Sequence, residues 1–175
     1  MTRDANLKVR VKSAKGRKLS STRWLERQLN DPYVREANRL GYRSRAAFKI
    51  LEIDDKFKIF KPGQCILDLG AAPGGWSQVV ANIVNSQSTS GQVLAIDILP
   101  IDALSGVKAM KLDIFEENAI SLIKKQMIKP SADVILSDMA PSTTGHKATD
   151  HLRIVALLES ALDIVDNLLS EGGTF

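Results

Sequence analysis

The stretch from Cys65 to Ser77 reads CILDLGAAPGGWS, and the order of its residues decides the fold. An apolar run ends at Leu69, a loop with three glycines and one proline follows, and Trp76 stands where a helix would begin. Glycine adopts φ > 0 or allows another group to approach closely, whereas proline fixes φ and has no N–H to donate. The pattern therefore predicts a buried strand, a tight loop shaped for contact with a ligand, and a helix.

The composition favours one globular unit. The chain has 175 residues, of which 44% are hydrophobic, and this is enough for a single core. Cys65 is the single cysteine, so no disulfide can form within the chain and a reducing compartment is expected. Neither a secretory signal nor an apolar run of membrane-spanning length occurs, so we expect a cytoplasmic protein without a membrane partner.

The charge is divided unevenly along the chain. Residues 1–61 hold 17 Lys/Arg against 7 Asp/Glu, whereas residues 62–175 hold 7 against 13, so the two parts carry net charges of +10 and −6. A basic segment on an acidic body is typical of a protein that binds a polyanion such as RNA. We expect residues 1–19 to form a flexible basic arm and residues 20–175 to form the folded domain. The alternative for the arm is a tail that only increases solubility.

Strands and helices alternate along the rest of the chain. The patterns predict strands at Gln64–Leu69, Gly91–Ile98, Val107–Leu112 and Ala132–Ser137. They predict helices at Arg45–Phe57, Ser77–Val84 and Glu116–Met127, and a long helix that follows the loop Asp138–Thr149, runs to Leu169 and is closed by Glu171-Gly172-Gly173. This alternation predicts an α/β fold: a mostly parallel sheet with helices on both faces and a ligand at the carboxyl ends of its strands.

Three acidic residues stand where predicted strands end: Asp97, Asp113 and Asp138. Each alone is open to a simpler reading as a turn residue or a helix cap. Together with the loop that starts at Gly70 they converge on one edge of a parallel sheet, where Asp97 can accept hydrogen bonds from the hydroxyls of a ribose. The glycines follow G-x-x-x-G-G and not G-x-G-x-x-G, and no G-K-[ST] follows to hold phosphates. The pattern predicts a nucleotide-like ligand. His146 and His151 have no Cys or paired acid at ligand spacing, so no metal site is expected.

Three separated motifs resemble a known family. They are D-L-G-A-A-P-G-G-W-S at Asp68–Ser77, S-D-M-A-P at Ser137–Pro141 and R-S-R-A-A-F-K at Arg43–Lys49. In this order they resemble the FtsJ/RrmJ class of S-adenosylmethionine-dependent RNA ribose 2′-O-methyltransferases. The segment S-S-T-R-W-L-E-R-Q-L-N-D-P-Y-V, which starts at Ser20, is most similar to the bacterial heat-shock type, which methylates a uridine ribose in large-subunit ribosomal RNA.

The resemblance implies a Rossmann-like methyltransferase fold, S-adenosylmethionine as cofactor, and ribosomal RNA, in the assembled large subunit, as the partner of a monomeric enzyme. It implies catalytic roles for Lys49 and Asp138, and cofactor contacts from Gly74, Trp76, Asp97, Asp113 and Asp138. The family's catalytic tetrad also includes a second lysine in the strand after Gly-Gly-Thr-Phe and a later glutamate. The sequence ends at Phe175, so we expect the final strands to be missing and methyl transfer by this chain to be slow.

Two alternative functions stay open at this point. A nicotinamide-dependent oxidoreductase would share the fold and the ribose-binding Asp97, although its glycine pattern would differ and the basic segment would have no purpose. A non-catalytic RNA-binding module would explain the basic segment alone. The first would bind a nicotinamide cofactor, and the second would bind RNA without binding S-adenosylmethionine.

Overall fold

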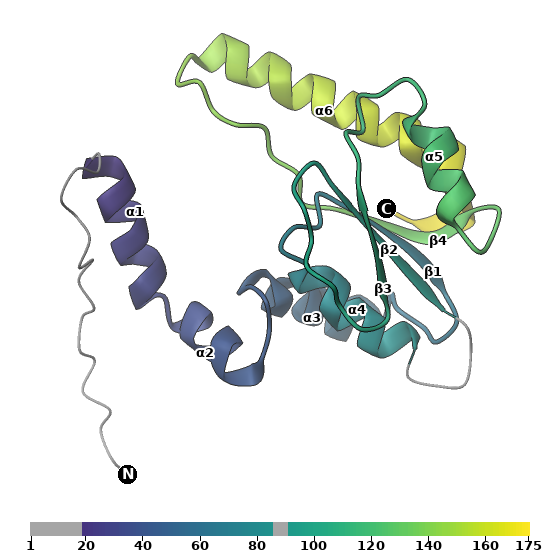
Figure 1. Cartoon of the computed structure of the whole chain (residues 1–175), viewed down its shortest axis with the longest axis horizontal. Helices are drawn as coiled ribbons and strands as arrows, with labels where there is room; N and C mark the ends of the chain where they lie inside the picture. The colour runs from purple at the N-terminus through teal and green to yellow at the C-terminus, as the bar shows by residue number, and fades with distance from the viewer. Residues whose placement is uncertain (1–18, 86–90) are drawn as a thin grey trace.

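The computed structural model describes residues 19–85 and 91–175 (Figure 1). Residues 1–18, which make up nearly all of the predicted basic arm, lie outside the described residues. The elements are α1 (Leu19–Asn30), α2 (Pro32–Leu40), α3 (Ala46–Phe57), β1 (Cys65–Leu69), α4 (Gly75–Val84), β2 (Gln92–Asp97), β3 (Val107–Lys111), α5 (Ala119–Gln126), β4 (Ala132–Ser137), α6 (Lys147–Leu168) and β5 (Leu169–Thr174). The predicted alternation of strands and helices is confirmed.

The strands form one sheet in the order β3-β2-β1-β4-β5, and every neighbouring pair is parallel. The chain moves from β1 outward through β2 to β3, and then crosses back to place β4 on the other side of β1. This reversal puts a topological switch point between the carboxyl ends of β1 and β4. In open parallel sheets the ligand binds at such a point.

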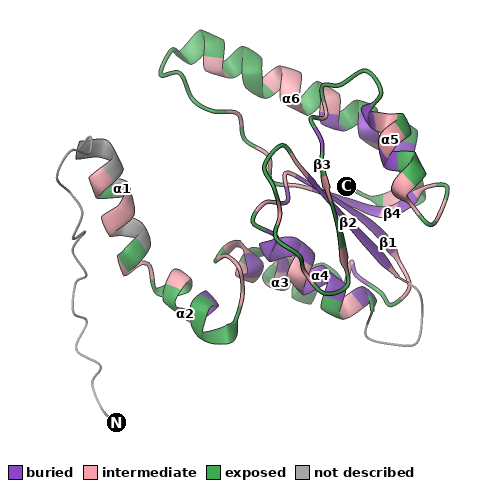
Figure 2. Cartoon of the chain, viewed as in Figure 1, coloured by how far each residue is buried: buried purple, intermediate pink, exposed green. Residues whose placement is uncertain are grey.

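Helices cover both faces of the sheet, as predicted. On one face α3 and α4 pack against alternate strand residues, and their buried cluster includes Ile50, Ile66, Val80 and Val134. On the other face α5 and α6 cover a second cluster that includes Leu67, Leu94, Ile123 and Ile164. Figure 2 shows the central strands buried between these two layers. β1 is buried along its whole length, because it is central in the sheet and covered on both sides.

The N-terminal segment forms two helices that lie to one side of the body (Figure 1). Asp31 caps α2, because its carboxylate accepts a hydrogen bond of 2.8 Å from the backbone N–H of Tyr33. Pro32 occupies the first helical position, and Gly41 ends the helix with a φ of 76°. Neither helix was predicted from the sequence, although the Asp-Pro start and the glycine stop of α2 are clear signals.

One predicted boundary is wrong. The long helix was expected to reach Leu169 and to be closed by Glu171-Gly172-Gly173, whereas α6 ends at Leu168 and the following residues form β5. Leu169 has an extended backbone, and β5 hydrogen-bonds to β4 from Ala132↔Leu169 onward with a register shift. The glycines therefore accommodate an irregular edge strand and do not cap the helix. The helix α6 begins at Lys147, so the loop that was predicted to span Asp138–Thr149 is shorter than expected.

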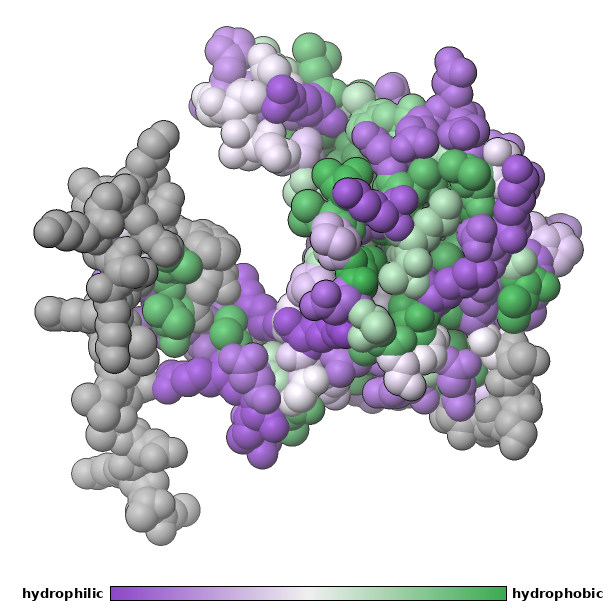
Figure 3. All heavy atoms as spheres, viewed as in Figure 1, coloured by the Kyte–Doolittle hydropathy of each residue, from purple (hydrophilic) through white to green (hydrophobic). Residues whose placement is uncertain are grey.

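No helix within 19–85 and 91–175 combines the length and the hydropathy needed to cross a bilayer. On the face shown in Figure 3, hydrophilic and hydrophobic residues are intermingled over the described body.

Candidate active site

Two cavities open at the carboxyl edge of the sheet. The larger, of about 800 Å³, lies between the ends of β1, β2 and β4 and the first half of α6. The smaller, of about 430 Å³, lies between the glycine-rich loop and the segment that joins α2 to α3. Gly70 and Asp138 line both cavities. The two spaces therefore meet at the switch point between β1 and β4.

Two of the predicted carboxylates are held in place at the rim of the larger cavity. Asp97 ends β2, and its two oxygens accept hydrogen bonds of 2.8 Å each from the backbone N–H groups of Ala72 and Leu99. Asp113 follows β3 and accepts a hydrogen bond of 3.0 Å from the N–H of Phe115. Carboxylate oxygens that accept one bond each keep further lone pairs, so both groups can still accept hydroxyl or amino donors from a ligand.

The glycine-rich loop brings two distant segments into close contact. A Cβ atom at Gly70, whose φ is +76°, would lie 2.3 Å from the Cγ of Met139 in the loop after β4. A Cβ atom at Gly75 would lie 2.1 Å from the Oγ of Ser44. Gly74 is the buried N-cap of α4 with a φ of 102°, and it is not among the residues that line either cavity. Its contact with a cofactor stays a prediction.

The structure brings together one predicted residue from each motif. The ammonium nitrogen of Lys49 on α3 lies 3.2 Å from Oδ1 of Asp138 and 5.0 Å from the centre of the Trp76 ring. Trp76 is buried, and its ring N–H donates a hydrogen bond of 2.8 Å to the carbonyl of Ala46. The indole is thus a fixed platform under a cation. The side chains of Lys49 and Asp138 are 58% and 52% exposed, so a substrate can reach both.

Asp68, the first residue of the motif Asp68–Ser77, is a buried acid to which no role was assigned from the sequence. It lies within β1 at 1% exposure and accepts a hydrogen bond of 2.6 Å from the hydroxyl of Ser77 on α4. Burial, together with the nearby charges of Asp138 and Asp97, raises the pKa of Asp68 to about 6, although the bonds from Ser77 oppose this shift. Asp68 also lines the smaller cavity, so this group lies at the floor of the site.

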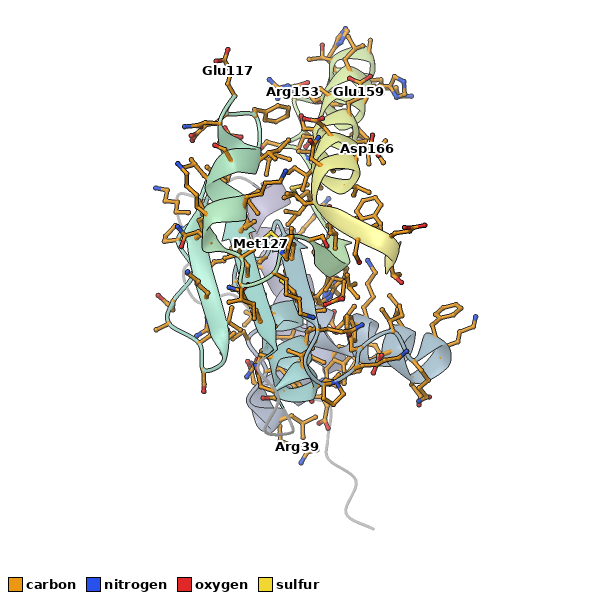
Figure 4. The ribbon with its side chains drawn as sticks, turned by 90° about the vertical axis from the view of Figure 1, so that its right-hand side faces the viewer. Arg39, Glu117, Met127, Arg153, Glu159 and Asp166 are labelled. Atoms are coloured by element: carbon orange, nitrogen blue, oxygen red, sulfur yellow. The ribbon has the colours of Figure 1, made fainter. Side chains whose placement is uncertain are left out.

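The larger cavity suits a nucleoside. Its volume falls in the range of small-molecule sites, roughly 300–1,000 Å³. Ile98, Leu99 and Phe115 are exposed apolar residues on its wall, and Asp97 and Asp113 supply acceptors. Arg153 on α6 also lines this cavity and donates a hydrogen bond of 3.1 Å to the carbonyl of Ser142 (Figure 4). Within the described part of the chain, no group of three or more His, Cys, Asp or Glu residues is placed to hold a metal.

The sheet is parallel, a glycine-rich loop lies at its switch point, and acids at three strand ends surround a nucleoside-sized cavity. Together these features define a Rossmann-like α/β enzyme. Residues 42–175 match the FtsJ-like methyltransferase family, and the chain belongs to this family. The resemblance drawn from the three motifs is thereby confirmed.

The relatives are named for one kind of RNA. A protein of Ruegeria pomeroyi is 51% identical over 175 residues, covering 97% of this chain and 75% of its own length. A protein of Paramagnetospirillum magneticum is 54% identical over 172 residues, covering 97% and 70%. Both carry the name ribosomal RNA large subunit methyltransferase E. A solved structure described as a putative ribosomal RNA methyltransferase, from Plasmodium falciparum, superposes with a TM-score of 0.67 at 30% identity over 75% of each chain.

Proposed function

We propose that this protein transfers the methyl group of S-adenosylmethionine to the ribose 2′-hydroxyl of a uridine in large-subunit ribosomal RNA. A carbon–oxygen bond forms as the carbon–sulfur bond breaks, S-adenosylhomocysteine leaves as a neutral thioether, and the hydroxyl proton is released to solvent. The observation that carries the proposal is the placement of Lys49, Trp76 and Asp138 where the nucleoside-sized cavity meets a second, open cavity. We further propose that the protein acts in the cytoplasm, as a monomer, on the assembled subunit.

The residues of the larger cavity would hold the methyl donor. The Asp97 carboxylate, fixed by two backbone N–H groups, would accept hydrogen bonds from the ribose hydroxyls of the donor. The apolar wall would take the adenine ring, with Asp113 at its edge. Trp76, which lines the smaller cavity, would border the end nearest the reaction, and Gly74, which lines neither cavity, would act through the turn that starts α4. When bound, this cofactor supplies an electrophilic methyl group on a sulfonium.

The chain's own residues would then align the acceptor. Methyl transfer is an in-line displacement, and correct orientation of the two reactants supplies on the order of 7–11 kcal/mol. Asp138 lines both cavities, so it borders the point where donor and acceptor meet. Lys49, held by Asp138 and by the face of Trp76, would donate a hydrogen bond to the acceptor hydroxyl or to a neighbouring phosphate.

The RNA would approach from the basic side. Exposed cations lie on α2, on the segment that joins α2 to α3, and on α3. They include Arg35, Arg45, Lys49 and Lys56. Phosphate contacts of this kind position a nucleic acid without reading its sequence. Residues 62–175 carry a net negative charge, which would repel the polyanion and so keep it on the basic side.

Calorimetric titration with S-adenosylmethionine and with NAD⁺ tests the assignment. We expect binding of the first and not of the second, and we expect Asp97→Ala to weaken it at least several-fold because charge-assisted hydrogen bonds are lost. Asp166→Ala, which removes an exposed carboxylate on α6 away from both cavities, is the matched control and should leave the affinity unchanged. Binding of NAD⁺ would favour the oxidoreductase. Binding of RNA without S-adenosylmethionine would favour the non-catalytic module.

A further inference from the structure

Arg43 joins three backbone carbonyls that belong to two different loops. Its Nη1 donates hydrogen bonds of 3.1 Å to the carbonyl of Pro73 and 2.8 Å to that of Asp102, and its Nη2 donates one of 2.6 Å to Ala103. Its own backbone N–H donates a bond of 3.0 Å to the side chain of Gln78 on α4. Hydrogen bonds therefore hold both the backbone and the guanidinium of Arg43 in place.

Both loops border the larger cavity, the first through Gly70 and the second through Ile98 and Leu99. Pro73 lies in the glycine-rich loop between β1 and α4, and Asp102 lies in the segment that leads from β2 to β3. This second segment follows Asp97, and its first residues line the cavity together with Asp97. The guanidinium also packs against the glycine-rich loop, since a Cβ atom at Gly74 would lie 3.4 Å from its Nη1.

We propose that Arg43 is a positioning residue, which holds these two loops at a fixed separation so that the methyl-donor cavity is preformed. This role depends on the proposed function only in that the ligand is taken to be S-adenosylmethionine. A planar guanidinium presents five N–H donors in a rigid fork, and a lysine ammonium cannot reproduce that geometry across three carbonyls. Preforming a site removes the cost of ordering its loops when the ligand binds.

These hydrogen bonds give the side chain of Arg43 a different role from that of the basic residues near it. The guanidinium of Arg45, two residues on, pairs with Asp31 and is 52% exposed, so it faces solvent where a phosphate can reach it. The Nη donors of Arg43 are directed to carbonyls of the chain itself. Removing the Arg43 fork should therefore change cofactor binding more than RNA binding.

The test compares Arg43→Lys and Arg43→Ala with Arg39→Lys. Arg39 is an exposed arginine on α2 that pairs with Glu36, so this control makes the same exchange away from the loops. Amide hydrogen exchange in the free protein reports the loops directly. The reporters are the N–H groups of Ala72, Gly74, Leu99 and Val107, which are hydrogen-bonded within or between the two loops.

We expect both Arg43 variants to speed exchange at these amides about tenfold or more, while the amides of β1 keep their protection. We also expect the Kd for S-adenosylmethionine to rise about tenfold even in Arg43→Lys, with the salt dependence of RNA binding unchanged. Unchanged exchange at the loops, equal acceleration throughout the sheet, or full rescue by lysine would overturn the proposal. Faster loop exchange in a protein that does not bind S-adenosylmethionine would support the positioning role and contradict the proposed function.

Discussion

The ammonium group of Lys49 and the carboxylate of Asp138 lie 3.2 Å apart, although 89 positions separate them in the sequence. Lys49 projects from α3, which covers one face of the sheet, whereas Asp138 follows β4 at the switch point. Because both side chains are more than half exposed, the pair contributes little to stability in itself. Asp138 lines both cavities, and this position supports the proposal that the pair acts on a ligand.

We expect Lys49→Ala and Asp138→Ala each to slow methyl transfer by roughly 10- to 1,000-fold in the intact protein. The Kd for S-adenosylmethionine should change more in Asp138→Ala, because Asp138 lines the cofactor cavity and Lys49 does not. Single-turnover incorporation of a radiolabelled methyl group measures the rate. Lys124→Ala, an exposed lysine at the end of α5 and away from both cavities, should transfer at the normal rate. Normal transfer by Lys49→Ala would remove this residue from the mechanism.

The buried Asp68 predicts a pH dependence of stability. Because its pKa rises from 3.8 to about 6 on folding, its carboxyl is protonated in the folded state and ionised in the unfolded state between these values. Relative to Asp68→Asn, the free energy of unfolding should therefore fall by about 2 kcal/mol as the pH rises from 4 to 6. Urea denaturation of both proteins at several pH values measures this difference.

Asp150→Asn is a control for which the pH dependence of the free energy of unfolding should run in the opposite direction. Hydrogen bonds from the backbone and hydroxyl of Thr144 lower the pKa of Asp150, so its contribution to stability is present above the unfolded pKa and is lost as the pH falls through the folded pKa. A difference between wild type and Asp68→Asn that stays flat from pH 4 to pH 6 would show that Asp68 does not take up a proton on folding.

The close contact at Gly70 predicts a large cost for a small substitution. Gly70→Ala would place a methyl group 2.3 Å from the Cγ of Met139, at a φ of +76°. Gly145→Ala is the matched control, because Gly145 has a φ of +86° but nothing within 4 Å of the added atom. Both variants bear the backbone strain of roughly 1–2 kcal/mol, and Gly70→Ala should lose roughly 1–3 kcal/mol more through overpacking. Equal free energies of unfolding for the two variants would show that these loops move apart freely.

The basic segment predicts RNA binding that depends on salt. Residues 1–19 carry seven Lys/Arg and one Asp, and deleting them should reduce the slope of log K against log salt by about 0.7 for each phosphate that they neutralise. Replacing Lys124 and Lys125, exposed cations at the end of α5, should leave the slope unchanged. Filter binding at several salt concentrations measures it. An unaltered slope after the deletion would support the view that the arm only increases solubility.

The elements that the sequence predicted best are the ones whose signals are local. Runs such as Cys65–Leu69 and Ala132–Ser137 are apolar and bounded by Gly, Pro or Asp, so the four predicted strands agree with β1 to β4 within one or two residues. The strand β5 was missed because the apolar periodicity of α6 continues through Leu169, and the strand depends on pairing with β4. Pairing between distant segments leaves no local pattern.

The same distinction applies to the candidate site. The acids at the strand ends were predicted to converge because parallel strands end at one edge, and Asp97, Asp113 and Asp138 do line one cavity. The role of Lys49 came from the family resemblance, since a lysine on an amphipathic helix is usually solvated. The bonds of Arg43 to Pro73, Asp102 and Ala103 span 30 to 60 positions, and no spacing in the sequence predicts them.

The position of the transferred methyl group tests the central claim most directly. The intact protein is incubated with S-adenosylmethionine labelled in the methyl group and with large ribosomal subunits that lack the modification, and the recovered RNA is hydrolysed in alkali. A 2′-O-methyl group blocks cleavage of the adjoining phosphodiester, so the account predicts that the label appears in an alkali-resistant dinucleotide. Label released in mononucleotides, which would place the methyl group on a base, would contradict it.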